Sequence, residues 1–257
     1  MLTNDMTFMK FFVFLSLEFF LCCKGFGQTI RMAVSANAQF VAQALKESFE
    51  KQHPGKLELV VGSSGKLTAQ IEQGAPYAVF LSADMGYPQE LYKKGFSVAS
   101  PRVYAYGKLV LWTLKDLAIK EGLKIVQQPA VKTIAIGNPA VAPYGVAAME
   151  AMKKVGVYDK IKNKIVYGES IAQVNQYLLT GAADLVFTAK SVVEDPAMKN
   201  KGQWIEVNDS LYQPIEQGVV VLKQAQGDGL EYAQDFYHFL FSAPAKAIFT
   251  AYGYRVK

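Results

Sequence analysis

The chain has 257 residues and a net charge of +5, from 27 Lys and Arg against 22 Asp and Glu. No dense basic run concentrates this charge, which argues against a nucleic-acid-binding protein. The length suffices for one large domain or for two lobes of roughly 100 residues each.

The N-terminal segment, residues 1–27, is typical of an export signal. Lys10 precedes the apolar run FFVFLSLEFFL, which is too short to span a bilayer, and small residues surround a cleavage point before Gln28. The true start is open among three methionines, Met1, Met6 and Met9. We therefore expect the mature protein to be exported to a periplasm through a cleaved signal peptide.

Both cysteines, Cys22 and Cys23, lie in this segment, so the mature chain is expected to contain no thiol. A lipid anchor on one of them is the alternative to a cleaved signal. A lipid anchor favours a small residue before the cysteine, whereas Leu21 precedes Cys22. We therefore favour a free periplasmic protein. No later apolar stretch approaches 18 residues, so the mature protein is expected to be soluble.

One sequence pattern occurs twice. Residues 62–80 run from Gly-Ser-Ser-Gly through a helical pattern to Gly-Ala and then Val-Phe, and residues 168–187 run from Gly-Glu-Ser to the same two pairs. Upstream, AVSAN at 33–37 matches AIGN at 135–138. Repeats in register predict two lobes, each with strands that alternate with helices, as in parallel βαβ units.

Two β-rich runs, GKLVLW (107–112) and EQGVVVLK (216–223), connect these repeats without obvious turns. We predict that both cross between the lobes. The predicted fold class is α/β, with two parallel-sheet lobes joined by two crossing strands. Such a hinge brings two sets of turns face to face.

The crossing strands make the first predicted lobe discontinuous, at residues 28–107 and 217–257. The second predicted lobe is residues 108–216. Helical patterns over 229–241 and 244–252, separated by a proline, return the chain to the first lobe.

Four polar turns follow predicted strands and precede predicted helices. They are Ser35-Ala36-Asn37, Gly62-Ser63-Ser64-Gly65, Asn138 to Gly145, and Gly168-Glu169-Ser170-Ile171. Ligands of α/β sheets bind at such turns, whose free N–H groups and helix dipoles attract anions. Capping alone explains any single turn, and Ser170 is expected only to cap the helix 171–180. Four turns in two matching lobes favour an anion site, to which side chains add neutral donors, from Asn37, Ser63, Ser64 and Tyr144.

A secreted hydrolase with Ser64 as nucleophile is the alternative from a different class. The required glycine is missing, because Lys66 occupies its position. Of the two histidines, His53 is expected to be exposed at a helix end and His238 to be a packing or solvent-edge residue, so a catalytic triad is not predicted. We predict a binder rather than an enzyme, without catalytic residues or cofactor. The acids Asp84 and Asp184 are expected to cap or pair, because a carboxylate would repel an anion.

SSGKLTAQIEQGAP, VFLSAD, AIGNPAVAPYG and the closing AYGYRVK resemble the periplasmic molybdate-binding proteins of ABC importers, from about residue 30 to 257. The resemblance implies a periplasmic-binding-protein fold of type II. It further implies a monomer that holds molybdate, and also tungstate, in an interlobe cleft and delivers it to an ABC permease in the inner membrane. The molybdenum would be held as the oxyanion, without a bond between metal and protein. A binder of another oxyanion, such as sulfate, is the alternative.

Position by position, the resemblance implies ligand contacts from Ala36, Asn37, Ser64, Tyr144 and the N–H of Ile171; Ser63 joins this set as a neighbouring hydroxyl. One branch of the family has a tyrosine donor where this chain has Phe187, which cannot donate. Another branch uses an asparagine in the first turn and a tyrosine in the PYG turn, and this sequence follows it. Because every contact donates, a protonated anion such as hydrogen phosphate is disfavoured, and cavity size must reject sulfate.

Overall fold

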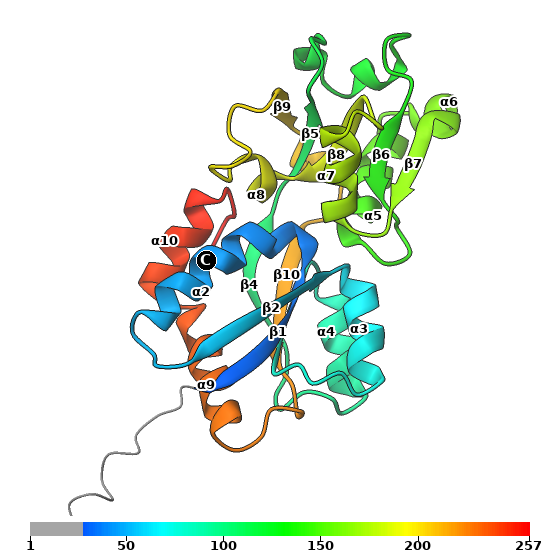
Figure 1. Ribbon diagram of the computed structural model, residues 1–257. Coiled ribbons are helices and arrows are strands. Elements are labelled where there is room, and N and C mark those ends of the chain that lie inside the picture. The colour runs from blue at the N-terminus through cyan, green and yellow to red at the C-terminus, as the bar shows by residue number, and fades with distance from the viewer. Residues whose placement is uncertain (1–27) are drawn as a thin grey trace, which may run out of the picture.

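The computed structural model describes residues 28–257, which form two lobes, each built on a five-stranded sheet (Figure 1). The predicted signal peptide, with Cys22 and Cys23, lies outside the described residues. Among residues 28–257, no helix combines the length and apolar character needed to cross a membrane.

Lobe 1 has the strand order β2-β1-β3-β10-β4. Its strands are β1 (Thr29–Ser35), β2 (Lys56–Gly62), β3 (Val79–Ser82), β4 (Arg102–Gly107) and β10 (Ile215–Val221). Its helices are η2 (Ala36–Ala38), α2 (Gln39–Glu50), α3 (Ser64–Glu72), α4 (Gly86–Lys93), α9 (Asp228–Phe239) and α10 (Ala243–Ala251). Figure 1 shows α2, α9 and α10 on one side of this sheet and α3 and α4 on the other.

Lobe 2 has the matching order β7-β6-β8-β5-β9. Its strands are β5 (Leu109–Thr113), β6 (Ile134–Gly137), β7 (Ile165–Gly168), β8 (Leu185–Ala189) and β9 (Gln203–Glu206). Its helices are η3 (Ile119–Gln127), α5 (Pro143–Lys154), α6 (Tyr158–Ile161), η4 (Lys162–Lys164), α7 (Ile171–Leu179), α8 (Lys190–Val193) and η5 (Asp209–Leu211).

The repeat predicted from sequence is confirmed by this topology. In lobe 1, β1 runs parallel to β2 and β3, and in lobe 2, β6 runs parallel to β7 and β8. A helix follows each repeated strand, so α3 and α7 begin at equivalent places. The C-terminal helices also exist, within two residues of their predicted ends.

The predicted parallel strands make up only part of each sheet, because both sheets are mixed. β10 runs antiparallel to β3 and β4, and β5 runs antiparallel to β8 and β9. Each of these strands enters its sheet directly from the other lobe rather than through a helical crossover. A strand that arrives by this route points opposite to the repeated strands.

The two crossing runs also differ from the prediction of continuous strands. The run 107–112 is divided between β4 and β5, which belong to different sheets and are separated by Lys108. The run 216–223 starts inside β10, so the return crossing is the segment 207–214 between β9 and β10, which contains η5. Both crossings are therefore short connections between strands.

Each lobe has its own core, because the helices turn their apolar positions onto the sheets. α2 buries Val41, Leu45 and Phe49 at the four-residue spacing of one helical face. Phe49 also packs edge-on against Phe236 of α9, with ring centroids 5.2 Å apart. In lobe 2, the fully buried Trp112 of β5 belongs to the second core.

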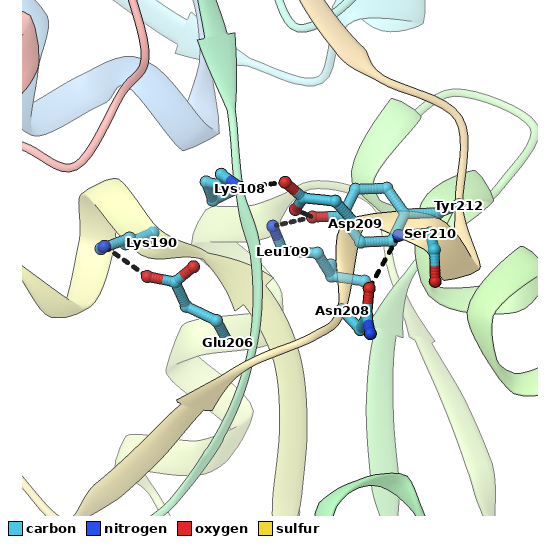
Figure 2. A network of polar contacts seen from close by, with 8 residues as sticks. All are labelled: Lys108, Leu109, Lys190, Glu206, Asn208, Asp209, Ser210 and Tyr212. Carbon is cyan, nitrogen blue, oxygen red and sulfur yellow. Dashed lines mark hydrogen bonds and ion pairs between the residues drawn. The ribbon is translucent and has the colours of Figure 1, made fainter.

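Figure 2 shows the polar contacts that tie the two crossings together. Lys108, between β4 and β5, forms an ion pair with Asp209 of the return crossing. The Tyr212 hydroxyl donates to Asp209 at 3.0 Å and accepts from the Leu109 N–H at 3.2 Å. The first crossing is thus bound to the second by an ion pair and two hydrogen bonds around one tyrosine.

Candidate anion-binding site

All six residues predicted to contact the ligand line one small cavity between the lobes. The lining consists of Ser35, Ala36, Asn37, Ser63, Ser64, Ala83, Ala142, Pro143, Tyr144 and Ile171. The six predicted residues are each no more than 5% exposed. Within residues 28–257, no group of three or more His, Cys, Asp or Glu side chains is placed to hold a metal ion.

Helix starts surround this cavity because each of the four turns leads from a strand into a helix. α3 begins at Ser64, α7 begins at Ile171, and α5 begins at Pro143, whose missing N–H costs nothing in the first helical position. The first N–H groups of a helix have no acceptor inside that helix. Ser170 caps α7 by accepting from the Gln173 N–H at 3.3 Å, as predicted. The cavity therefore lies at the positive ends of helices from both lobes.

The two adjacent serines of the second turn have different roles. Ser63 accepts from the Lys66 N–H at 3.4 Å and is the N-cap of α3. The Ser64 hydroxyl lies 2.6 Å from the Ser35 hydroxyl, and the Ala83 N–H donates to both, at 3.0 and 3.1 Å. Only one of the two hydroxyl protons can lie between these oxygens. Within the described residues the other proton has no acceptor and is available to a ligand.

Tyr144 carries the second available hydroxyl. Its side chain is 1% exposed, and among the described residues its hydroxyl has no hydrogen-bond partner. Burial raises the pKa of this phenol well above its ordinary value, so it keeps its proton. A buried hydroxyl without a partner costs about 1–3 kcal/mol, which an acceptor atom in the cavity would relieve.

The Asn37 side chain does not offer its donors to the cavity, contrary to prediction. Its Nδ2 donates to Gln217 Oε1 at 2.7 Å and to the Tyr254 hydroxyl at 3.2 Å. The side-chain amide of Asn37 already has partners within the protein. Asn37 can therefore donate to a ligand through its backbone N–H instead.

Behind Asn37 lies a buried polar network that the sequence analysis misses. The Ser191 hydroxyl donates to the Asn37 carbonyl at 2.6 Å, and the Tyr254 hydroxyl lies 3.2 Å from Ser191 Oγ. Ser191 belongs to α8 of lobe 2, so this network joins the lobes. For Gln217 the sequence does contain one indication of a buried polar role, because this polar residue directly precedes the apolar run GVVV.

Three contacts close the lobes over the cavity on its other side. The Gly65 N–H donates to the Val141 carbonyl at 3.0 Å, and the Tyr87 hydroxyl donates to the Ala140 carbonyl at 3.2 Å. Lys66 pairs with Glu169 at 3.2 Å, but both side chains are more than half exposed, so this pair adds little stability. The structure is therefore the closed arrangement of the lobes.

The two acids have the structural roles predicted for them. Asp84 accepts from the Tyr87 N–H at 3.2 Å at the start of α4. Asp184 accepts from the Thr133 N–H at 2.9 Å and pairs with Lys115, and these contacts outweigh its burial and lower its pKa. Neither carboxylate lines the cavity.

Neither histidine lies at the cavity or contacts the Ser64 hydroxyl. His53 is half-buried rather than exposed as predicted, because its ring stacks on Phe49 with centroids 4.1 Å apart. His238 is exposed near the end of α9. Phe187 is fully buried within β8 and does not line the cavity either.

The comparisons with known proteins place this geometry in a family. A family model described as bacterial extracellular solute-binding protein matches residues 30–255. The molybdate-binding protein ModA of Azotobacter vinelandii is 37% identical, over 91% of this chain and 92% of the relative. ModA of Rhodobacter capsulatus is 38% identical, over 86% of each chain.

The folds agree as well. A solved structure, the periplasmic molybdate-binding protein of Azotobacter vinelandii, matches with a TM-score of 0.84 and 34% identity, over 89% of this chain and 99% of that one. The match covers both lobes and the turns between them. The chain belongs to the family of bacterial extracellular solute-binding proteins.

Proposed function

We propose that the protein binds molybdate in the cavity between its lobes, as the solute-binding component of an ABC importer. The Tyr144 hydroxyl, which has no hydrogen-bond partner among residues 28–257, carries this proposal, because it is a buried donor that a bound acceptor would satisfy. Two relatives of high coverage, both called molybdate-binding protein, support the choice of ligand. Tungstate, with the same charge and nearly the same size, is expected to bind as well.

The chemistry of the cavity suits a fully deprotonated oxyanion. The free serine proton, the Tyr144 hydroxyl and the N–H groups at the helix starts all donate, and within residues 28–257 no carboxylate lines the cavity. Each oxygen of a tetrahedral dianion can accept such bonds, whereas the O–H of hydrogen phosphate would meet another donor. Sulfate satisfies the same donors, so its rejection depends on its smaller size.

Closure of the lobes connects binding to transport. A bound anion joins groups of lobe 1, such as Ser64, to groups of lobe 2, such as Tyr144, and so favours the closed arrangement. We infer that the closed form delivers its ligand to a permease in the inner membrane. The protein would act in the periplasm as a monomer, without catalysis and without a cofactor, and would hold molybdenum only as its oxyanion.

Calorimetric titration of residues 28–257 with molybdate, tungstate, sulfate and phosphate tests the proposal. We expect molybdate and tungstate to bind tightly, and sulfate and phosphate to produce no heat of binding. Stronger binding of sulfate than of molybdate would move the function to another oxyanion importer. Absence of binding for all four anions would refute the proposal.

A further inference from the structure

Gln217 is a fully buried polar residue on β10, directly behind the cavity. Its Nε2 donates to the Ala83 carbonyl at 3.1 Å, and its Oε1 accepts from Asn37 Nδ2 at 2.7 Å. Ala83 and Asn37 both belong to the lining of the cavity. Gln217 thus joins two separate turns of the site without lining the site itself.

The contacts of Gln217 determine which way the Asn37 amide points. A carbonyl oxygen only accepts, so the Ala83 carbonyl requires the Nε2 end of Gln217. The Oε1 end of Gln217 then faces Asn37 at 2.7 Å, a distance at which Nδ2 donates whereas a second amide oxygen would be repelled. The Ala83 carbonyl therefore sets the orientation of the Asn37 side chain through Gln217.

The Tyr144 hydroxyl lies close to this pair of amides. A Cβ atom placed on Gly107 would lie 2.1 Å from the Tyr144 hydroxyl and 3.0 Å from Gln217 Nε2, so both atoms pack against one glycine. Burial raises the pKa of Tyr144, and the Asn37 side chain partly offsets this, as a nearby N–H donor does. The contact does not reach hydrogen-bond geometry, so the hydroxyl stays without a partner among the described residues.

Reversal of the Asn37 amide would give the Tyr144 hydroxyl an acceptor within the protein. The Asn37 Oδ1 would replace Nδ2 beside Tyr144, and an amide oxygen accepts a phenol proton readily. The hydroxyl would then be satisfied within the protein and lost to the ligand. The orientation of Asn37 thus decides where the Tyr144 proton goes.

We propose that Gln217 is a positioning residue that keeps the Tyr144 hydroxyl proton free for the bound oxyanion, an inference that rests on the proposed function. Gln217 acts by holding the Asn37 amide in the orientation in which Nδ2 donates to Gln217 and Tyr254, so that Oδ1 does not face the Tyr144 hydroxyl. It touches no ligand atom. Its effect on binding therefore exists only while Tyr144 has a hydroxyl.

A double-mutant cycle measures this dependence. Gln217→Met keeps the length of the side chain but removes both ends of the amide, and Tyr144→Phe removes the hydroxyl. Because one charge-assisted hydrogen bond is lost in each case, we expect each change to weaken molybdate binding by about ten- to a hundredfold. The double variant should bind no more weakly than Tyr144→Phe alone.

Gln224→Met is the matched control. Gln224 is a half-buried glutamine of the same lobe that donates to the Ile71 carbonyl at 3.4 Å, away from the cavity. Gln224→Met is expected to leave the affinity for molybdate unchanged, because Gln224 does not line the cavity. If Gln217→Met does the same, with affinity unchanged, Gln217 is only structural and the inference is overturned.

Gln217→Glu provides a second variant in case Gln217→Met does not fold. It keeps an acceptor oxygen toward Asn37 Nδ2, so the amide keeps its orientation. The added negative charge of Gln217→Glu should weaken molybdate binding independently of the Tyr144 hydroxyl. The affinity losses of Gln217→Glu and Tyr144→Phe should therefore multiply in the double variant. The inference would be overturned if the affinity loss from Gln217→Met multiplied with that from Tyr144→Phe. It would also be overturned if the affinity loss from Gln217→Glu disappeared in the double variant with Tyr144→Phe.

The wild-type titration in the same series separates the two proposals. If the wild type binds none of the four oxyanions, both the proposed function and this inference fail. If the wild type binds molybdate but the losses of Gln217→Met and Tyr144→Phe multiply, only the role of Gln217 fails.

Discussion

Two buried tyrosines, Tyr144 and Tyr254, differ in how their hydroxyls are satisfied. Tyr254 contacts Asn37 and Ser191, whereas among the described residues Tyr144 contacts no polar partner. A hydroxyl of the first kind contributes to folding, and one of the second kind opposes it. The unsatisfied hydroxyl of Tyr144, the residue that we propose to contact the ligand, therefore lowers the stability of the unliganded protein.

This difference leads to a prediction for two matched variants. Tyr144→Phe should leave the free energy of unfolding of the unliganded protein unchanged or raise it, since it removes an unsatisfied hydroxyl, and it should weaken molybdate binding. Tyr254→Phe should lower that free energy by about 1 kcal/mol for each hydrogen bond lost. Urea denaturation without ligand measures both effects. A clear loss of stability in Tyr144→Phe would show that its hydroxyl has a partner.

Much of the site could be predicted from sequence, because its parts are local. Ser64, Tyr144 and Ile171 lie in turns between a strand and a helix. Such turns can be recognised in a sequence by their small and polar residues. Ser191 and Tyr254 were not predictable, and Gln217 was marked only by its polar side chain before an apolar run, since the contacts of all three with Asn37 join distant parts of the chain. The roles of Ser63 and Ser64 also depend on where α3 begins, which sequence places only within a few residues.

At the level of elements, the N-terminal turn of α3 controls how closely the lobes approach. Gly65 is helical, so alanine there should favour the helix by up to about 1 kcal/mol. A Cβ on Gly65 would, however, lie 2.8 Å from the Tyr87 hydroxyl and 3.0 Å from Val141 Cα across the cleft. Gly65→Ala should therefore weaken ligand binding about tenfold or more by opposing closure, without lowering the stability of the unliganded protein.

Gly86→Ala is the control for this prediction, because Gly86 also starts a helix and its nearest neighbours would be 3.8 Å from the new Cβ. Calorimetry and thermal denaturation of both variants make the comparison. Equal affinities for the two variants would mean that closure tolerates the added methyl group.

The ion pair between the crossings gives a pH-dependent contribution to stability. Burial raises the pKa of Asp209, but donation from Lys108 and Tyr212 outweighs it and holds the pKa below its ordinary value. A carboxyl with a lowered pKa stabilises the fold fully above its unfolded pKa, about 3.9, and loses this effect as the pH falls through the folded value. Because Asp209 is 54% exposed, the contribution should not exceed about 1 kcal/mol.

Asp209→Asn should accordingly reduce the free energy of unfolding at pH 7, and the difference from wild type should shrink as the pH falls below about 4. Asp159→Asn serves as control, because Asp159 is 89% exposed and its Lys162 partner is 4.0 Å away. Urea denaturation between pH 7 and pH 3 measures both. A difference of the same size at pH 7 and at pH 3 would exclude the ion pair as its cause.

The direction of the strands was the part of the fold that the sequence did not reveal. β5 is a buried apolar run and β10 ends in one, Val219 to Val221, and such runs look alike in parallel and antiparallel surroundings. The repeat predicted the parallel part of each sheet, since strands and helices alternate there. The antiparallel strands arise from the route of the chain between lobes, which no local pattern encodes.

For the whole molecule, ligand binding and stability are coupled. At a free molybdate concentration 1,000 times the Kd, the free energy of unfolding should rise by about 4 kcal/mol. For a protein of this size, that rise corresponds to an increase of about 8–16 °C in the thermal midpoint. Differential scanning calorimetry with increasing molybdate checks the value, and sulfate at equal concentration is the control. An equal shift with both anions would indicate a general salt effect.

The exchange of strands between the lobes also fixes the order in which the protein can be completed during synthesis. All five strands of lobe 2 lie between Leu109 and Glu206, so its sheet can form as one continuous stretch of nascent chain. The sheet of lobe 1 lacks its fourth strand until β10 emerges, after the whole of lobe 2. Until then the edges of β3 and β4 that β10 will cover are open to wrong partners. The lobe in which the described chain begins is therefore the lobe whose sheet is completed last.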